Sequence, residues 1–596
     1  MRGVHARTHI PPNTVCVTIP RRCLITVEMG QATPIGQAIL DSDLDLDAPK
    51  HIFLMIYLLW DRKVNGPSSF FHPYYDILPK TLCNMPIFWT PEELSYLEGS
   101  YLLTQIADRN EAIAEDYHSI CQIAPLAQIC TLDEFKWARM CVCSRNFGLQ
   151  IDGHRTSALV PHADMLNHYR PRETKWTFDE DRQAFTITRY VFGPQIHFVR
   201  FLGLRLLIFC LSAHPVNCDS LQHIPTGAQV YDSYGQKCNH RFLLNYGFAV
   251  EDNREIDGFC PDEVPLELYV SPEDPLFSQK LDFWTRGEIG ATSTSTTHHH
   301  PSQQQQQNAP SSTSLQKNNY NQSHPISVST GSSAAFSSSS TNHAASPVIK
   351  RIRVCVSNNE NTRLLFSLLR ALVCNREELR AVTSPVSSEA SVSRAMFGLT
   401  ADPGRTATST SAGSTTTYYR TCRDIRHPIG LRNERAAMRL LLEVIGRQLA
   451  RYPTSLAQDV SDLMNEHAYP RFSNRRHAKI QVRGEKEVLH HFARWARTAL
   501  DVLEVIESEI KEENGVEVTM TSGGRTITEE RPGFDFVIRR MEEEESGSIH
   551  HTILRYCADV LGSLRREEFK NLRRRRVQTK PTFVSKSSSG SSGSFF

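Results

Sequence analysis

The sequence predicts an α+β fold in which short β-sheets are combined with helices and are followed by a helical C-terminal half. Two patterns predict this fold. Before residue 250, apolar residues alternate with other residues over short segments, as at Val15, Val17 and Ile19, and a period of two is that of a strand. After residue 430, apolar residues return at three- and four-residue steps, as at Leu440 and Val444, which is typical of an amphipathic helix.

The composition is that of a soluble globular protein. Of 596 residues, 40% are hydrophobic and 22% are charged, and a chain of this length forms roughly two to four domains. The formal net charge is +1, so no global field favours nucleic acid or an anionic membrane. We therefore expect no nucleic-acid partner, and we expect a monomer.

An apolar run from residue 196 to 213 is the one candidate for a membrane span. Arg200 and Arg205 interrupt it, and an arginine at the centre of a span costs about 2.5–3.5 kcal/mol. No stable membrane insertion is therefore expected. The 15 cysteines include no CxxC pair, which predicts reduced thiols, a cytoplasmic or nuclear protein, and no metal site.

Helical patterns dominate residues 51–147. Apolar residues are too dense in residues 51–61 for a surface helix, so this helix is predicted to be buried. Thr90 followed by Pro91 and two carboxylates predicts a capped helix start. Residues 73–79 carry a proline at each end and are predicted to form a loop.

A β-hairpin is predicted from residue 175 to 188. Trp176 and Phe178 are expected on one face of the first strand, and Phe185 and Ile187 on the same face of the second strand, after a short polar turn. A turn at residues 225–227 then leads into a further short strand.

The C-terminal half alternates between helices and low-complexity segments. Residues 287–347 consist mostly of Ser, Thr, Gln, Asn and His and are predicted to be a disordered linker, and residues 383–417 a Ser/Thr-rich loop. Asn433 is predicted to cap a helix, and Gly484 to open the next one. The tail, residues 512–596, is charged and ends in Ser/Gly repeats, so it is predicted to be largely disordered.

Two short motifs carry the candidate chemistry. The first is Asp164-Met165-Leu166-Asn167-His168, and the second is Tyr231-Asp232-Ser233-Tyr234-Gly235, which continues into Asn245-Tyr246-Gly247-Phe248. Each motif alone is typical of an ordinary turn or strand. In this order and spacing, and together with Ser144-Arg145-Asn146-Phe147, they are much more specific.

The motifs resemble those of the SET-domain protein methyltransferases, in the branch typified by the RuBisCO large-subunit lysine methyltransferases and the SET-domain actin-histidine methyltransferase. The resemblance covers most of the chain and includes residues 2–6, 17–28 and 476–489. It implies a SET domain at residues 1–252 with a helical insert at about 51–147. It also implies an all-α substrate-binding domain at residues 253–286 and 348–511, through which a protein substrate binds.

The resemblance implies S-adenosyl-L-methionine as the methyl donor. The residues expected to bind it are Arg2, Gly3, Arg145, Asp164, Asn167, His168, Tyr234, Gly247 and Phe248. The residue types suit a zwitterionic ligand, because an arginine offers a charged fork to a carboxylate and an asparagine offers both a donor and an acceptor. Glycine lets the backbone come close to a ligand.

Tyr234 is expected to be the catalytic tyrosine, and Phe147, Ala163 and Tyr231 to form the substrate pocket. In the histidine-methylating relative an asparagine replaces Phe147 and a tryptophan replaces Ala163, whereas lysine-directed relatives carry an aromatic and a small residue there. An aromatic wall accepts a lysine stem, while an imidazole nitrogen needs a polar partner. We therefore favour lysine as the acceptor, with histidine as the alternative.

Two departures from the family pattern favour a second hypothesis, a catalytically degenerate SET domain that acts as a protein-binding module. The chain begins inside the first strand of the family's SET domain, so residues expected before Arg2 are absent from it. Residues 189–220 form an atypical insertion that matches nothing in the family and is expected to be translated non-coding sequence.

Overall fold

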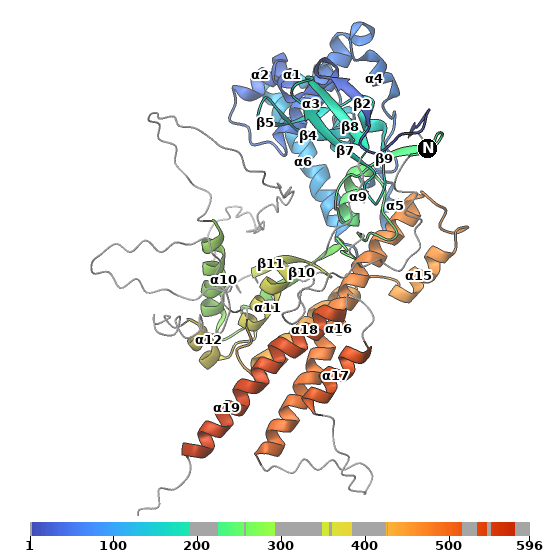
Figure 1. The fold of residues 1–596 in the computed structure, drawn as a ribbon. Helices are drawn as coiled ribbons and strands as arrows, with labels where there is room; N and C mark the ends of the chain where they lie inside the picture. Colours follow the sequence, from blue (N-terminus) through green and yellow to red (C-terminus); the bar gives the residue numbers. More distant parts are fainter. Residues whose placement is uncertain are drawn as a thin grey trace, which may run out of the picture. The chain divides into compact units, whose positions relative to one another are not determined.

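Figure 1 shows the computed structural model of the chain. The described residues are 3–189, 224–255, 258–292, 348–356, 360–383, 425, 427–514, 533–544 and 550–578. The predicted insertion beyond Arg189, the linker from residue 293 to 347 and the Ser/Thr-rich loop from residue 384 to 417 lie outside them.

Packing divides the chain into two compact units, which we call unit 1 and unit 2. Unit 1 comprises Met1–Glu263 and Leu449–Val488, and unit 2 comprises Val264–Gln448 and Leu489–Phe596. The units differ from the predicted domain boundaries, because residues 449–488 pack with the N-terminal part of the chain.

Unit 1 contains three small sheets of three strands each among its described residues. Their strand orders are β1-β9-β6, β2-β8-β7 and β3-β5-β4. The strands are β1 (Val4–His5), β2 (Val15–Pro20), β3 (Ile25–Thr26), β4 (Asn146–Ile151), β5 (His154–Leu159), β6 (Asn167–His168), β7 (Thr174–Asp179), β8 (Ala184–Arg189) and β9 (Gln229–Asp232).

The predicted hairpin is confirmed in β7 and β8. Trp176 pairs with Ile187, and Phe178 pairs with Phe185, in the antiparallel register that the alternation predicts. Phe185 and Ile187 are fully buried, so the apolar face of the hairpin packs into the core of the sheets.

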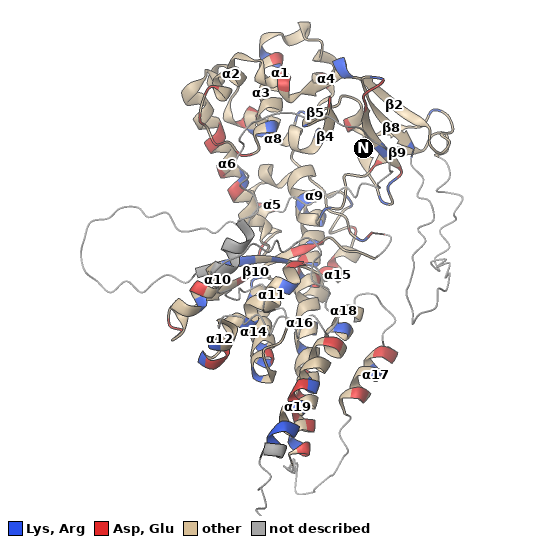
Figure 2. Cartoon of the chain, turned by 60° about the vertical axis from the view of Figure 1, so that its left-hand side comes forward, with Lys and Arg blue, Asp and Glu red and all other residues tan. Residues whose placement is uncertain are grey.

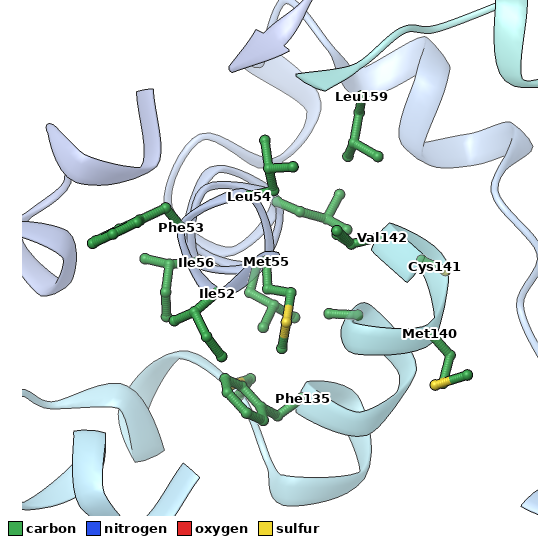
Figure 3. Close-up of a cluster of buried hydrophobic side chains, with 14 of the residues drawn as sticks. Ile52, Phe53, Leu54, Met55, Ile56, Phe135, Met140, Cys141, Val142 and Leu159 are labelled. Atoms are coloured by element: carbon green, nitrogen blue, oxygen red, sulfur yellow. The ribbon is translucent and has the colours of Figure 1, made fainter. Parts of the chain in front are cut away.

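The helices of unit 1 include α3 and α8, which build the apolar core shown in Figure 3. They are α1 (Val27–Gln31), α2 (Pro34–Leu40), α3 (Pro49–Val64), α4 (His72–Ile77), α5 (Pro91–Ser95), α6 (Leu102–Ile123), α7 (Leu126–Ile129), α8 (Leu132–Arg145), α9 (Asn239–Tyr246), α15 (Leu456–Met464) and the first part of α16 (Asn474–Glu513). As predicted, α3 is buried: Ile52 and Leu54 are fully inaccessible and pack with Phe135 and Val142 of α8.

One predicted loop is a helix. Residues 73–79 were expected to be a loop because a proline stands at each end, yet α4 covers most of them with Pro73 in its first turn. The first turn is where proline is tolerated in a helix, because its missing N–H has no intrahelical partner there. The predicted start at Thr90 is confirmed, since its hydroxyl and the Glu93 carboxylate cap each other's backbone N–H.

Unit 2 is mostly helical and also contains a two-stranded sheet, β10 (Glu263–Val270) with β11 (Val348–Cys355). Its helices are α10 (Phe277–Thr292), α11 (Glu360–Leu372), α12 (Arg376–Thr383), most of α14 (Leu431–Leu449), the second part of α16, α17 (Phe534–Glu544), α18 (His550–Arg555) and α19 (Gly562–Gln578), with a π-helical stretch (Tyr556–Leu561) between the last two. Residues 287–292 belong to α10, so they are not part of the linker that was predicted to begin at residue 287.

Two predicted helix starts are wrong. Asn433 lies inside α14 and is fully buried, where its side chain donates to the carbonyl of Arg370 at 3.1 Å. Gly484 lies inside α16, which runs unbroken for 40 residues. Asn433 therefore contributes to packing inside the helix rather than capping its start. Gly484 is an ordinary glycine in a helix interior, and its cost to helix stability is outweighed by the helix-forming residues around it.

The prediction of a largely disordered tail is also wrong for its described part. Residues 534–544 and 550–578 are helical, and Phe534, Ile553, Leu561 and Leu564 are buried. Figure 2 shows acidic and basic residues interspersed along α17 and α19. The few apolar residues are enough to anchor these helices, while the charges occupy their exposed faces. Among the described residues, no helix is both long and apolar enough to span a bilayer.

Candidate functional site

Strand β9 joins the two sequence motifs. Asn167 and His168 of β6 pair in parallel with Tyr231 and Asp232 of β9. Residues about 64 positions apart in the sequence are thereby held in adjacent strands, separated by the usual distance between neighbouring strands of a sheet. Backbone pairing in this sheet is therefore sufficient to place the two motifs next to each other.

The other edge of β9 positions the N-terminal glycine beside this pair. Strand β1 runs antiparallel to β9, with Val4 opposite Val230. A Cβ atom added to Gly3 would lie 2.1 Å from Nε2 of Gln229 and 3.2 Å from Nδ2 of Asn167. Glycine therefore permits the close approach of this backbone to Asn167. Arg2 lies outside the described residues.

Tyr234 follows β9 and is held at both its backbone and its hydroxyl. Its hydroxyl donates to the carbonyl of Leu166 at 2.8 Å, and its backbone N–H donates to Nδ1 of His168 at 3.0 Å. Burial raises the pKa of the phenol above its ordinary value, so the hydroxyl keeps its proton at neutral pH. Because that proton points to Leu166, the oxygen lone pairs face the other way.

The imidazole ring of His168 is neutral, and its N–H donor has no hydrogen-bond partner among the described residues. Its Nδ1 accepts from the Tyr234 backbone, so the ring proton resides on Nε2. Nε2 is buried and has no hydrogen-bond partner among the described residues. Burial lowers the pKa of His168 to about 3, helped by the positive charge of Arg170, so the ring stays uncharged at physiological pH.

Aromatic rings surround His168. The centroid of its ring lies 4.9 Å from that of Phe242, 5.2 Å from that of Tyr234 and 6.0 Å from that of Phe248. Tyr246 stacks on Tyr234 with centroids 4.8 Å apart. Helix α9 and the residues after it thus form an apolar wall against the two motifs.

Gly247 turns the chain from α9 toward Phe248. Its φ is +76°, a left-handed conformation that favours glycine, and a Cβ there would lie 2.1 Å from Nδ2 of Asn84. Asn84 donates from this nitrogen to the Gly247 carbonyl at 3.3 Å. The structure accounts for Gly247 by this helix end, and direct contact with a cofactor stays a prediction.

Arg145 is anchored by a buried carboxylate. Its Nη1 donates to Oδ2 of Asp164 at 3.0 Å, and the hydroxyl of Tyr74 donates to the same oxygen at 2.9 Å. The Asp164 side chain is fully buried, whereas that of Arg145 keeps 20% of its surface exposed. Burial raises the pKa of the Asp164 carboxyl, and the guanidinium opposes this rise.

This ion pair leaves two buried polar atoms without partners among the described residues. They are Nε of Arg145 and Oδ1 of Asp164. Asp164 was predicted to bind the cofactor; its buried carboxylate pairs with Arg145, and direct contact with a cofactor stays a prediction. Tyr74 was missed by the sequence reasoning, because it belongs to the segment that was predicted to be a loop.

A lysine beside Tyr234 was also missed. Nζ of Lys237 donates to the Tyr234 carbonyl and lies 5.9 Å from the ring centroid of Tyr246. Burial and the nearby positive charge of Arg241 lower the pKa of Lys237 to about 8. A lysine three residues after a motif tyrosine carries no sequence signal of its own.

Two of the three predicted substrate-pocket residues, Phe147 and Ala163, lie in or against the core of the sheets. The ring centroid of Phe147 is 5.0 Å from that of Phe185 and 5.6 Å from that of Trp176. Phe147 is partly buried and packs against the cluster of apolar residues that contains the buried Ala163. The ring of Tyr231 packs on Tyr169 at 5.1 Å. Phe147 and Ala163 therefore share one apolar environment.

Comparison with known proteins gives one family match. Residues 271–489 match the family model described as Rubisco LSMT substrate-binding. Actin-histidine N-methyltransferase of Xenopus tropicalis is 26% identical over 303 residues, which cover 49% of this chain and 45% of that protein. The human actin-histidine N-methyltransferase is 25% identical over 303 residues, covering 49% and 44%. The chain thus spans less than half the length of these curated relatives.

Solved structures agree on the fold. The structure described as the SET domain of LSMT bound to lysine and AdoHcy aligns with a TM-score of 0.50 at 18% identity, covering 87% of this chain and 89% of that chain. A second, bound to MeLysine and AdoHcy, aligns with a TM-score of 0.50 at 19% identity, covering 88% and 90%. The expected fold class and the expected resemblance are confirmed.

Proposed function

The chain combines the SET fold with a Rubisco LSMT substrate-binding domain, as does the branch of SET-domain methyltransferases that it resembles, and we propose that it is an S-adenosyl-L-methionine-dependent protein methyltransferase. The observation that carries the proposal is the sheet β1-β9-β6, which sets Gly3, Asn167, His168 and Tyr231 side by side just before Tyr234.

The residues present fit the cofactor. The methyl donor, when bound, supplies a sulfonium methyl group together with an amino-acid end that carries both charges. Arg145 is fixed through Nη1 and keeps Nε without a partner among the described residues, so its guanidinium suits the carboxylate of that end. Nε2–H of His168 is a second donor that the described part of the chain leaves without a partner, at a ring packed among aromatic side chains.

Tyr234 is the residue that we assign to the chemical step. Its hydroxyl proton is committed to Leu166, so its oxygen presents lone pairs to the reacting methyl group. Such an oxygen favours positive charge on that group and fixes its direction, which is what an in-line transfer requires. Its raised pKa keeps it a phenol, so Tyr234 orients and does not act as the base.

We propose lysine as the acceptor. A lysine must arrive unprotonated, and moving from a pKa of about 10.4 to pH 7 costs roughly 4.6 kcal/mol at 1.36 kcal/mol per unit. Entry into an apolar channel lowers the pKa of the amine and supplies part of that cost. The setting of Phe147 among Trp176 and Phe185 supports an apolar wall of this kind.

Histidine is the second candidate acceptor. The curated relatives that support it are named for methylation of actin histidine. The absence of a polar side chain at positions 147 and 163 speaks against it, because an imidazole nitrogen needs a hydrogen-bond partner to be aligned. The helical domain matched by residues 271–489 supports a protein as the substrate in either case.

The proposal is tested with the full chain and two tyrosine variants. We expect the wild-type protein to release heat on titration with S-adenosylhomocysteine and to transfer radiolabelled methyl groups to protein. Tyr234→Phe should lower kcat by about 10²–10³-fold, while its affinity for S-adenosylhomocysteine changes little. Tyr269→Phe, at a tyrosine of unit 2 that is 44% exposed, is the matched control and should keep full activity.

Two outcomes decide between the hypotheses. A folded wild-type chain that neither binds S-adenosylhomocysteine nor transfers methyl would be the binding module instead. Acid hydrolysis of the labelled protein product separates the acceptors, since methyl-lysine and methylhistidine elute apart. Recovery of methylhistidine alone would replace lysine with histidine. We expect Phe147→Asn combined with Ala163→Trp to raise the share of methylhistidine.

A further inference from the structure

Three potential metal ligands converge in unit 1, outside the residues assigned to methyl transfer. Cys238 is the N-cap of α9, His240 lies in its first turn, and Glu263 begins β10. Sγ of Cys238 lies 3.4 Å from Nε2 of His240 and 3.9 Å from Oε1 of Glu263. Nε2 and Oε1 are 3.7 Å apart.

The arrangement does not suit a proton relay. In a relay, the thiol and the carboxylate would face different nitrogens of the ring, so that one accepts while the other donates. Here Cys238 and Glu263 both approach Nε2 of His240, and a single nitrogen carries at most one proton. Three ligand atoms that lie within 4.8 Å of one another are instead an arrangement that can hold a cation.

The three distances fit a tetrahedral zinc ion. Zinc lies about 2.3 Å from sulfur, about 2.0–2.1 Å from nitrogen and about 2.0–2.2 Å from oxygen. With tetrahedral angles, these bond lengths separate the ligand atoms by roughly 3.4–3.6 Å. The observed separations of 3.4, 3.7 and 3.9 Å are within a few tenths of an ångström of those values.

We propose that Cys238, His240 and Glu263 bind one zinc ion, with solvent as the fourth ligand. Sulfur, imidazole and carboxylate together favour zinc over magnesium or calcium, which prefer oxygen alone. Cys238 and His240 are buried and Glu263 is partly exposed, so the side toward Glu263 gives access to water. Binding releases the thiol proton to solvent, and the thiolate and carboxylate charges balance the ion.

The surrounding hydrogen bonds hold the ligands in place. Between the first two ligands, the backbone N–H of Asn239 donates to Oδ1 of Asp262 at 2.7 Å, and its side chain donates to Oδ2 at 3.1 Å. Asp262 directly precedes Glu263, so these bonds tie the start of α9 to the start of β10. The proposed ion would clamp the same two segments and so fix α9, whose rings pack on His168 and Tyr234.

No sequence motif predicted this site. No metal site was expected because the chain has no CxxC pair, and the pair used here is Cys238-x-His240 with a glutamate 23 residues later. A turn into a helix brings the first two together, and the return of the chain at β10 supplies the third.

The test is metal content and metal-dependent absorption of the full chain. The metal is first removed with a chelator, and zinc is then added back. We expect the protein to hold close to one zinc ion per chain, measured by mass spectrometry of the metal. Cobalt(II) in place of zinc should give the intense bands of a tetrahedral thiolate complex. Cys238→Ser should remove the thiolate band and weaken zinc binding by about tenfold or more. Cys83→Ser, at an exposed cysteine, should change neither property.

A second variant guards against misfolding. Glu263→Gln keeps the size of the side chain and should weaken zinc binding while circular dichroism remains that of the wild type. Zinc should raise the Tm of the wild type and of Cys83→Ser but not that of Cys238→Ser. A folded wild-type chain that takes up no zinc, or a Cys238→Ser variant that binds it equally well, would overturn the proposal.

Discussion

In each unit an arginine, a buried carboxylate and a buried tyrosine pack together, and the two sets differ in how fully their hydrogen bonds are satisfied. In unit 2, Arg370 donates to both oxygens of Glu434 at 2.7 Å, and the hydroxyl of Tyr556 donates to one of them as well. Nη1 of Arg370 donates to the Ile425 carbonyl at 3.2 Å. Arginine and glutamate are both almost inaccessible, so we call this set the closed triad.

In unit 1, Arg145 reaches only one carboxylate oxygen of Asp164, Oδ2, which also accepts from Tyr74, and Nη1 of Arg145 donates to the Asp164 backbone carbonyl at 3.3 Å. The other oxygen of Asp164 and Nε of Arg145 have no partners among the described residues. We call this set the open triad. An arginine, a carboxylate and a tyrosine thus serve stability where both carboxylate oxygens are paired, and we propose that they keep capacity for a ligand where pairing is incomplete.

The largest expected effect comes from breaking the closed triad. Glu434→Gln leaves the Arg370 charge buried without a counter-charge and should lower the free energy of unfolding by about 3–5 kcal/mol. Urea denaturation measures this change. Glu443→Gln removes one partner of an exposed pair with Arg447 and should cost less than about 1 kcal/mol. Equal losses in both variants would contradict the assignment of a structural role to the closed triad.

The two tyrosines sharpen the comparison. Tyr556→Phe and Tyr74→Phe each delete one hydrogen bond to a buried carboxylate, so each should cost about 1.5–3 kcal/mol of stability. Calorimetry with S-adenosylhomocysteine should separate them, because only Tyr74 supports the arginine proposed to meet the cofactor. If Tyr556→Phe weakened cofactor binding as much as Tyr74→Phe, the division between the triads would fail.

Asp164→Asn tests the open triad directly. Its neutral side chain holds Arg145 less firmly, and the Kd for S-adenosylhomocysteine should rise by about tenfold, equivalent to about 1.4 kcal/mol. The exposed Asp152 also pairs with an arginine, Arg21, and Asp152→Asn is the matched control. An unchanged Kd in Asp164→Asn would mean that Arg145 needs no support from this carboxylate.

A further effect is expected from acid acting on His168. Its pKa is about 3 in the fold and about 6.5 in the unfolded chain, so below pH 6.5 the unfolded state binds a proton that the fold does not. This contribution to stability is intact above pH 6.5 and is lost as the pH falls toward 3. The Tm advantage of the wild type over His168→Asn should therefore shrink between pH 7.5 and pH 4.5. A variant of the exposed His154 is the control, and an advantage that grew on acidification would refute the sign.

Local patterns predicted the parts of the fold that depend on near neighbours. The alternation of Trp176 and Phe178 against Phe185 and Ile187 fixed the hairpin register, because a slip of one residue would expose its apolar face. The cap at Thr90 needed only a residue three positions away. The motifs identified by resemblance came together through the pairing of Asn167 with Tyr231.

Interactions between distant residues escaped prediction. Tyr74 meets Asp164 across 90 positions, and Arg370 meets Glu434 across 64, and no periodicity in either segment marks these pairs. Asn433 looked like a helix cap because its side chain commonly serves one, yet here tertiary packing buries it inside a helix. Side chains whose partners lie far along the chain are thus what a single sequence reveals least.

Trp176 has a practical consequence. It packs edge-on to Phe147 and stacked on Phe185, beside the predicted substrate pocket. Indole emission responds to the polarity around the ring, so a peptide that enters this pocket should shift the fluorescence of the protein. Trp176→Phe would identify how much of that signal arises here, which gives the chain a built-in optical reporter for screening acceptor peptides without any label.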